Sequence, residues 1–365
     1  MHRQLCPPSA WKTKRHLFCR ERRDNMNPYS LSHENLLKFL AALRSSGKTV
    51  YAPQRKGEKL FFAPLEDVRS VVFDYVQTTE SPKELLFPKY QKLISFDLAA
   101  GELQVKDHAK TTVPERVLFG SRPCDASALQ RLAEFFARDI SDTFVAQRQK
   151  ALSVISVSCT KADGDCFCTS AGTSPGDSTG SDILLTPIES GRYFVECLSE
   201  KGDALVASHK ELFEQSTPVE KERYLPKIEK TFSHEEIARK LAGAFGNEIW
   251  NSASLRCIGC GACAFVCPMC SCFDIQDEGT YKNGDRVRCW DSCGFSLFTQ
   301  HTSGHNPRPI QSDRWRQRVL HKFSYQPQQY DLLGCVGCGR CSRACPADMN
   351  LKEQLQDIAA IVDVA

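Results

Sequence analysis

The sequence lacks long apolar runs and a charge excess of either sign. No stretch approaches the roughly 18–20 apolar residues that a transmembrane helix requires, so we expect no membrane span. The 47 Lys and Arg residues barely outnumber the 44 Asp and Glu residues, which leaves a net charge of +3 over 365 positions. This balance gives no footprint for nucleic acid or for an anionic membrane, and we exclude both classes of partner.

Motifs of common catalytic and nucleotide-binding sites are also missing. The sequence has no G-x-G-x-x-G after a strand pattern, and therefore no visible Rossmann site for a nicotinamide or flavin nucleotide. It has no Walker A motif, no H-E-x-x-H pair and no serine nucleophile elbow. We therefore assign no catalytic residue, and the sequence leaves open whether the chain is itself an enzyme.

A secretory signal is missing as well. Residues 1–25 are basic and contain no apolar h-region. We expect this segment to be a disordered tail or a start site placed too early, with Met26 opening the folded chain. The expected location is the cytoplasm, where thiols stay reduced and cysteines serve as metal ligands more often than as disulfides.

Cysteine, in contrast, is abundant. The chain has 19 cysteines, about 5% of its residues, which is well above ordinary usage. Twelve of them lie between Cys257 and Cys345. Metal chemistry is therefore expected to be concentrated in the C-terminal third of the chain.

Residues 26–246 are predicted to form a mixed α/β domain. A capping box of Ser233 and Glu236 starts a helix that we expect to end at Gly246, and the domain boundary is placed there. A loop rich in Gly and Ser is expected from Ser170 to Asp182. The periodicity predicts helices over 34–43 and 126–139 and strands over 68–76, 115–120, 151–159, 182–190 and 193–198.

Residues 247–365 are predicted to form a second domain of helices and glycine-bearing loops, similar to a dicluster ferredoxin. Residues 269–334 form a long insert within it, and a helix capped by Asn350 and Glu353 closes the chain. The expected fold class of the whole chain is α+β, with the mixed α/β domain first.

A run of four cysteines and a proline occurs twice with identical spacing. Cys-x2-Cys-x2-Cys-x3-Cys-Pro begins at Cys257 ("CIGCGACAFVCP") and again at Cys335 ("CVGCGRCSRACP"). In bacterial two-cluster ferredoxins this run binds one iron–sulfur cluster through its first three thiolates, while its fourth cysteine binds the other cluster. Structural zinc, the alternative, favours two separated Cys-x2-Cys pairs and has no use for the proline.

We therefore predict two [4Fe–4S] clusters with crossed ligation. Glycines beside the cysteines would let each loop turn tightly, and Pro268 and Pro346 would stop the helix that follows. The predicted first cluster set is Cys257, Cys260, Cys263 and Cys345. The predicted second cluster set is Cys335, Cys338, Cys341 and Cys267.

Two further groups of cysteines are candidate metal sites. The N-terminal cysteine set is Cys124, Cys159, Cys166 and Cys168. Two of its members follow the carboxyl ends of predicted strands, where open α/β sheets bind ligands, so the set could hold a third [4Fe–4S] cluster. The alternative is a set of buried or redox-active thiols.

The second group follows the first motif. Its candidate ligands are Cys270, Cys272 and Cys293, with Cys289 as a weaker candidate. They could bind an additional cluster, or they could be polarizable side chains that only pack around the two predicted [4Fe–4S] clusters. Cys6, Cys19 and Cys197 have no partner pattern, and we expect them to be unligated.

A basic segment occupies the end of the insert. Its charged members are Arg308, Arg314, Arg316, Arg318, His321 and Lys322, with Trp315 and Val319 among them. This pattern is typical of a helix that packs through its apolar residues and solvates its basic face. Alternatively, the positive charge offsets anionic clusters or forms a docking face. His301 and His305 could be ligands, but isolated histidines more often satisfy local hydrogen bonds.

Six motifs are specific in combination: "FGSRPCDASAL", "CFCTSAGTSP", "CIGCGACAFVCPMCSCFDIQDE", "WDSCGFSLFTQHTSGHNPR", "RQRVLHKFSY" and "CVGCGRCSRACP". Together they resemble the beta subunit of cytoplasmic sulfhydrogenases, the group 3 nickel–iron hydrogenases. The A subunit of anaerobic sulfite reductase is similar and belongs to the same family. The resemblance covers roughly residue 29 to the C-terminus.

The resemblance implies an iron–sulfur electron-transfer subunit of a cytoplasmic complex. A flavin subunit would exchange electrons with NAD(P)H, and this chain would conduct them to or from a separate catalytic subunit. That subunit would hold a nickel–iron centre or, in the alternative, a sirohaem for sulfite reduction. A reductase with its own flavin or substrate site in the N-terminal domain is the remaining alternative.

Overall fold

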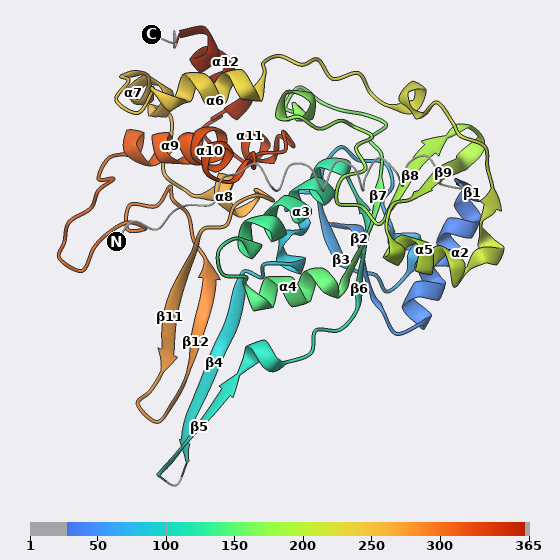
Figure 1. Ribbon diagram of the computed structural model, residues 1–365, viewed down its shortest axis with the longest axis horizontal. Coiled ribbons are helices and arrows are strands. Elements are labelled where there is room, and N and C mark those ends of the chain that lie inside the picture. Colours follow the sequence, from blue (N-terminus) through green and yellow to red (C-terminus); the bar gives the residue numbers. More distant parts are fainter. Residues whose placement is uncertain (1–27, 100, 362–365) are drawn as a thin grey trace.

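The computed structural model describes residues 28–99 and 101–361, so the predicted tail (1–25), Cys6 and Cys19 lie outside the described residues. A sheet-based N-terminal part is followed by a helical C-terminal part that carries both cysteine motifs (Figure 1). This arrangement confirms the predicted α+β class. Within the described residues, no helix has both the length and the apolar character needed to span a bilayer.

The larger sheet has eight strands in the described part of the chain. Its central strands β2, β6, β7 and β8 run parallel, and the remaining pairs are antiparallel. In sheet order the strands are β10 (Glu214–Gln215), β1 (Tyr29–Ser32), β9 (Arg192–Cys197), β8 (Ile183–Ile188), β7 (Leu152–Val157), β6 (Arg116–Ser121), β2 (Thr49–Lys56) and β3 (Lys59–Pro64).

Helices cover both faces of this sheet. Helices α2 (His33–Ser45) and α5 (Glu200–Ala207) pack on one face in a core that includes Phe39 and Phe119. Helices α3 (Pro123–Ala137) and α4 (Thr143–Lys150) pack on the other face, where Leu118 is buried. Because neighbouring strand residues point to opposite faces, Leu118 and Phe119 belong to different cores.

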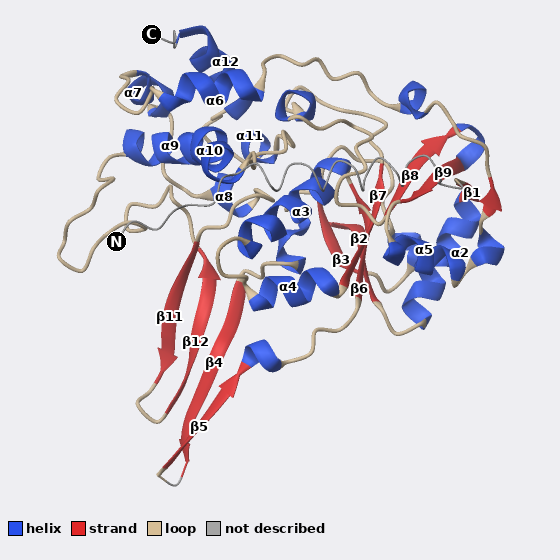
Figure 2. Cartoon of the chain, viewed as in Figure 1, coloured by secondary structure: helices blue, strands red, loops and turns tan. Residues whose placement is uncertain are grey.

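A second sheet forms an arm that projects from the body (Figures 1 and 2). Its strands, in sheet order, are β11 (Phe273–Gly279), β12 (Asn283–Trp290), β4 (Tyr90–Ala99) and β5 (Glu102–Asp107), and all of its pairs are antiparallel. β4 and β5 precede residue 246, whereas β11 and β12 belong to the insert. The two parts of the chain therefore share one sheet.

The C-terminal helices enclose a separate core. Trp250, Trp315, Phe323 and Leu355 are among its buried side chains. The helices are α6 (His234–Ala242), α7 (Ile249–Ser254), α8 (Ala262–Phe265), α9 (Gln311–Leu320), α10 (Gln326–Tyr330), α11 (Arg340–Arg343) and α12 (Leu351–Ile361), with a π-helical turn, η9 (His321–Tyr325), between α9 and α10. α6 packs in this core through Ile237 and Leu241, although it precedes the predicted boundary. The boundary at residue 246 stays a prediction.

Most of the elements predicted from the sequence are present. Ser233 accepts a hydrogen bond from the backbone of Glu236 at the start of α6, and Asn350 accepts one from Glu353 before α12. α6 ends at Ala242 rather than at Gly246.

The strand predicted over 68–76 is wrong. Val68–Ser70 forms a single 3₁₀ turn, and the residues after it have no regular structure. Val71 and Tyr75 are nevertheless buried. The apolar run covers the sheet as an irregular segment because β3 occupies the place beside β2.

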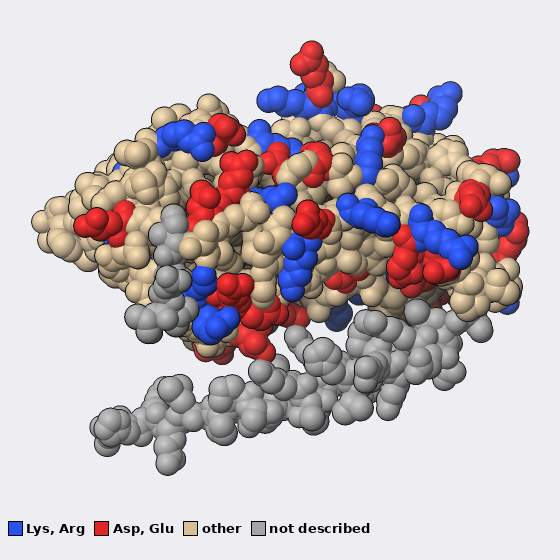
Figure 3. Space-filling model, turned by 90° about the horizontal axis from the view of Figure 1, so that it is seen from above, with Lys and Arg blue, Asp and Glu red and all other residues tan. Residues whose placement is uncertain are grey.

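Charges on the face shown in Figure 3 are interspersed, and cations and carboxylates alternate over it. This view agrees with the balanced composition.

Candidate metal centres

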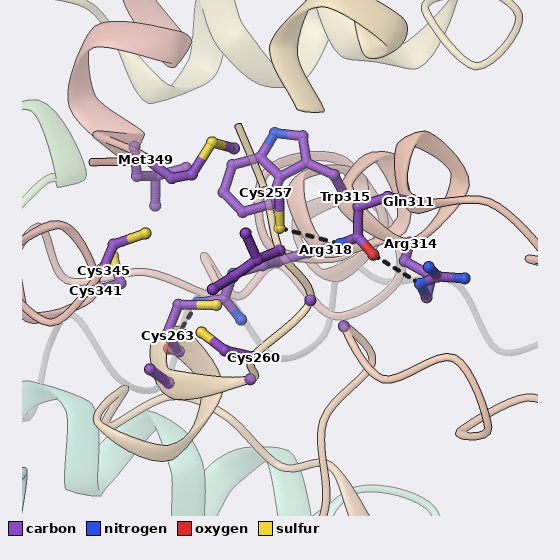
Figure 4. Close-up of a pocket in the computed structure, with 16 residues that line it drawn as sticks. Cys257, Cys260, Cys263, Gln311, Arg314, Trp315, Arg318, Cys341, Cys345 and Met349 are labelled. Atoms are coloured by element: carbon purple, nitrogen blue, oxygen red, sulfur yellow. Dashed lines mark hydrogen bonds between the residues drawn. The ribbon is translucent and has the colours of Figure 1, made fainter. Parts of the chain in front are cut away.

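The first cysteine loop opens on a cavity at the surface of the C-terminal part (Figure 4). Cys257, Cys260 and Cys263 line this cavity together with Cys345, which comes from the second motif. The structure therefore brings the four members of the predicted first cluster set together. Cys341 also borders the cavity, whereas Cys267 does not line it. The assignment of ligands stays a prediction.

Hydrogen-bond donors reach one sulfur and one carbonyl of this loop. Gln311 Nε2 lies 3.0 Å from Cys257 Sγ, and Gln311 in turn accepts a hydrogen bond of 2.9 Å from Arg314. Arg318 Nη2 donates to the carbonyl of Cys263 at 2.8 Å. Such contacts tune the potential of an iron–sulfur cluster, so the donor set fits an anionic cluster held by thiolates.

The second cysteine loop is buried. Burial raises the pKa of Cys335 to about 11 against the opposing charge of Lys322, and the neighbouring Cys267 contributes to the rise. Lys322 Nζ lies 3.5 Å from Cys267 Sγ. Burial alone would raise the pKa of Cys267, but Lys322 and Arg318 outweigh it and hold that pKa below its usual value. Burial raises the pKa of Cys341, and the thiols of Cys267, Cys335 and Cys338 add to the rise, so the four members of the predicted second cluster set lie near one another.

The N-terminal cysteine set lies against the second loop. Cys124 follows β6 at the start of α3, and Cys159 follows the adjacent parallel strand β7. Burial raises the pKa of Cys168 to about 12, and the thiols of Cys159 and Cys166 add to the rise. The placement at the carboxyl ends of two parallel strands agrees with the sequence argument.

Backbone contact ties this set to the second loop. Phe167 donates its N–H to the carbonyl of Gly337 at 2.9 Å. Gly337 has a φ of 62°, and a Cβ at this position would lie 2.4 Å from the carbonyl oxygen of Phe167. Only glycine fits such a position, so the loop glycines permit close approach as well as tight turning.

A buried ion pair reinforces the same contact. Arg340, which stands between Cys338 and Cys341, donates to Asp125 next to Cys124, with Nη2 to Oδ2 at 3.0 Å. Both side chains are almost completely buried. Removing one partner of such a pair leaves an uncompensated charge, so the pair fixes how the N-terminal set meets the second loop.

The remaining candidate ligands lie beyond the first motif. Cys270, Cys272 and Cys293 line one small cavity, and the neighbouring thiols of Cys270 and Cys293 raise the pKa of Cys272. We call this group the Cys270 site. Cys289 does not line that cavity; it lies on β12 with its Sγ 3.9 Å from the carbonyl oxygen of Asp274.

Other candidates are placed away from these groups. Cys197 lies on β9 at the edge of the first core, and burial raises its pKa to about 12. His301 and His305 stack edge to face in an exposed loop, with ring centroids 5.3 Å apart. All 17 cysteines in the described part of the chain are free of disulfides. No three or more His, Cys, Asp or Glu side chains in residues 28–99 and 101–361 are arranged to hold a single metal ion.

Buried cations adjoin the sulfurs. Lys83, Arg318 and Lys322 are each at most 6% exposed. None of the three has a carboxylate within 4.0 Å among the described residues. Buried cations without a counter-charge are costly, so an anionic centre held by the thiolates suits these surroundings.

These positions decide between the alternatives for the basic segment. Arg318 and Lys322 turn inward toward the cysteines, so a solvated basic face is wrong for both. Arg316 lies nearer the surface and pairs with Asp313. Lys83 was missed because "SPKELLF" gives no signal for a site. Arg340 could have been noticed from its place between two motif cysteines.

Two comparisons with known proteins concern the part of the chain that carries these cysteines. Residues 256–349 match the family described as a 4Fe-4S dicluster domain. The chain carries [4Fe–4S] clusters. It is also 28% identical over 342 residues to sulfhydrogenase 2 subunit beta of Pyrococcus furiosus, which covers 91% of this chain and 98% of that protein. The resemblance to sulfhydrogenase beta subunits is thereby confirmed, and the chain is an iron–sulfur electron-transfer protein.

Proposed function

We propose that this chain relays electrons within a cytoplasmic oxidoreductase complex. It connects a flavin subunit that exchanges electrons with NAD(P)H to a separate catalytic subunit of the nickel–iron hydrogenase type. The related protein of Pyrococcus furiosus is a sulfhydrogenase subunit, which supports this choice of partners. Crossed ligation of the first and second cluster sets is part of the proposal.

The observation that supports the proposal is that the three cysteine sets lie in succession, each in contact with the next. Cys260 is exposed, and Cys341 of the second motif borders the same cavity. Beyond the second loop, Gly337 touches the backbone of Phe167, which adjoins Cys166 and Cys168. Adjacent cofactors that run from the surface into the protein suit electron relay better than they suit chemistry on a substrate.

The N-terminal cysteine set supplies a third [4Fe–4S] cluster in this proposal. Its four thiols would be deprotonated on binding, because thiolates are the ligands of iron in such clusters. Donors are already in place at two of them: Gln77 Nε2 lies 2.9 Å from Cys124 Sγ, and Arg343 Nη2 lies 3.3 Å from Cys166 Sγ.

The test is to purify the tagged chain anaerobically from its native host. We expect a nickel-containing subunit and a flavin subunit to co-purify, and hydrogen to reduce NAD(P) only in the complete complex. A Cys159→Ser variant should lose about four irons per chain, the content of one cubane. The matched control, Cys197→Ser, should lose none.

Other outcomes separate the alternatives. A sirohaem subunit in place of the nickel protein would assign the chain to a sulfite reductase complex. A flavin bound by the isolated chain, with NAD(P)H oxidation by that chain alone, would contradict the relay.

A further inference from the structure

The Cys270 site includes an imidazole. The cavity lined by Cys270, Cys272 and Cys293 is also lined by His321. Cys270 and Cys293 are 5% and 8% exposed, and His321 is partly buried. Three thiols around one cavity leave one position of a four-ligand centre to another group, and the imidazole of His321 lines the same cavity.

The four side chains reach this cavity from three segments of the chain. Cys270 and Cys272 follow Pro268, while Cys293 lies in the turn just after β12. His321 is the first residue of η9, the π-helical turn that continues α9. π-helical turns occur frequently at functional sites, because the wider turn changes the side-chain directions that an α-helix would give.

The neighbours of His321 suit a metal ligand. Gln326 Nε2 lies 3.3 Å from His321 Nε2, while Gln326 Oε1 is buried without a hydrogen-bond partner among the described residues. Turning the Gln326 amide over would let Oε1 accept the Nε2 proton. Nδ1 would then keep its lone pair, and a ligating histidine usually donates its other N–H in this way.

The charge around the cavity favours an anionic centre. Lys83 Nζ donates to the carbonyl of Cys270 at 3.1 Å, and Arg318 and Lys322 both line the cavity. Lys83, Arg318 and Lys322 have no carboxylate within 4.0 Å in the described part of the chain.

We propose that Cys270, Cys272, Cys293 and His321 hold an additional [4Fe–4S] cluster, with the imidazole as the fourth ligand. Three thiol protons would leave on binding, while the neutral imidazole would bind without losing one. The inference extends the relay proposed above. Its test uses the isolated chain and does not depend on any partner.

The decisive measurement is pulsed EPR on the reduced full-length chain, prepared with ¹⁴N- or ¹⁵N-labelled histidine. We expect one cluster to show strong coupling to a histidine nitrogen, and the coupling should change with the isotope. In His321→Cys the nitrogen coupling should vanish while the iron content is retained, because thiolate replaces imidazole. Cys272→Ser should lose about four irons per chain.

A matched control distinguishes loss of the cluster from a general effect of replacing a cysteine. Cys289→Ser lies outside the cavity and should keep both the iron content and the nitrogen coupling. Absence of nitrogen coupling in a chain with full iron content would overturn the histidine ligand. Unchanged iron in Cys272→Ser, or zinc in place of iron at this site, would overturn the cluster. A chain that shows the coupling but recruits no hydrogenase would retain this inference while the proposed function failed.

Discussion

The two cysteine loops share one spacing but have different surroundings. In the first loop Ile258 is 69% exposed and Cys260 is open to solvent, whereas in the second loop Val336 is 1% exposed. The first loop faces a cavity at the surface, whereas the second loop packs against the N-terminal cysteine set. Under the proposed function, the exposed first loop would exchange electrons with a partner and the buried second loop would pass them inward.

Cysteine variants test whether the two loops form one unit through crossed ligation. We expect them to have the largest effect on the clusters, because each variant removes an iron ligand. We expect Cys345→Ser to damage the same cluster as Cys263→Ser, and Cys267→Ser to damage the same cluster as Cys341→Ser. Each variant should lose most of one EPR signal, because a thiolate ligand is missing. EPR and iron analysis would check this, and a shared signal loss in the Cys263 and Cys267 variants would falsify the crossing.

Alanine substitution of a loop glycine should lower the free energy of unfolding more in the second loop than in the first. An alanine Cβ at Gly259 would meet the flexible side chain of Gln311 at 3.2 Å and the backbone oxygen of Gly294 at 3.4 Å, an ordinary contact distance. At Gly337 it would lie 2.4 Å from the backbone oxygen of Phe167. Both sites have positive φ, so we expect Gly259→Ala to lose about 1–2 kcal/mol and Gly337→Ala to lose at least about twice that. Anaerobic thermal unfolding would measure the difference, and equal losses would contradict the close packing of the second loop.

The reduction potentials should respond to different neighbours. Lys322 is buried beside Cys267, so Lys322→Gln should lower the potential of one cluster by on the order of 100 mV, because a positive charge favours the reduced form. Gln311→Leu removes only a neutral donor to Cys257 and should lower the other potential by a few tens of millivolts.

Potentiometric EPR titrations would report both shifts. Lys282→Gln, at an exposed position in the arm, provides the matched control and should change neither potential. A Lys322→Gln shift smaller than that of Gln311→Leu would mean that the lysine does not serve the second cluster.

The smallest effect is expected at the exposed loop. Ile258→Ser should leave iron content and potentials unchanged but weaken binding of the partner about fivefold, which corresponds to about 1 kcal/mol of apolar burial. Val336→Ser, at the matching position of the buried loop, should instead destabilise the fold by about 2 kcal/mol. Binding measurements and thermal unfolding would check the pair; an equal effect on binding would argue against the exposed loop as the contact.

The sequence predicted best what depends on local spacing. The cysteine motifs, the caps at Ser233 and Asn350, and the strands before Cys124 and Cys159 all follow from short-range patterns, and the structure contains these elements. The strand expected over 68–76 failed because burial alone does not decide whether a segment joins a sheet.

Long-range features could not be read in the same way. The arm depends on pairing β4 with β12, which are nearly 200 positions apart, and no local pattern specifies that partner. Lys83 meets Cys270, and Arg340 meets Asp125, only after the chain has folded. The place of His321 in the Cys270 cavity likewise depends on tertiary packing.

The shared arm also limits how such a protein can be divided. Because β4 pairs with β12 along most of its length, a cut near residue 246 would leave each fragment with an unpaired strand edge. Unpaired edges recruit other chains and cause aggregation. The ferredoxin-like part is therefore not an interchangeable cassette: recombination that moved it into another protein would have to supply a new partner for its hairpin.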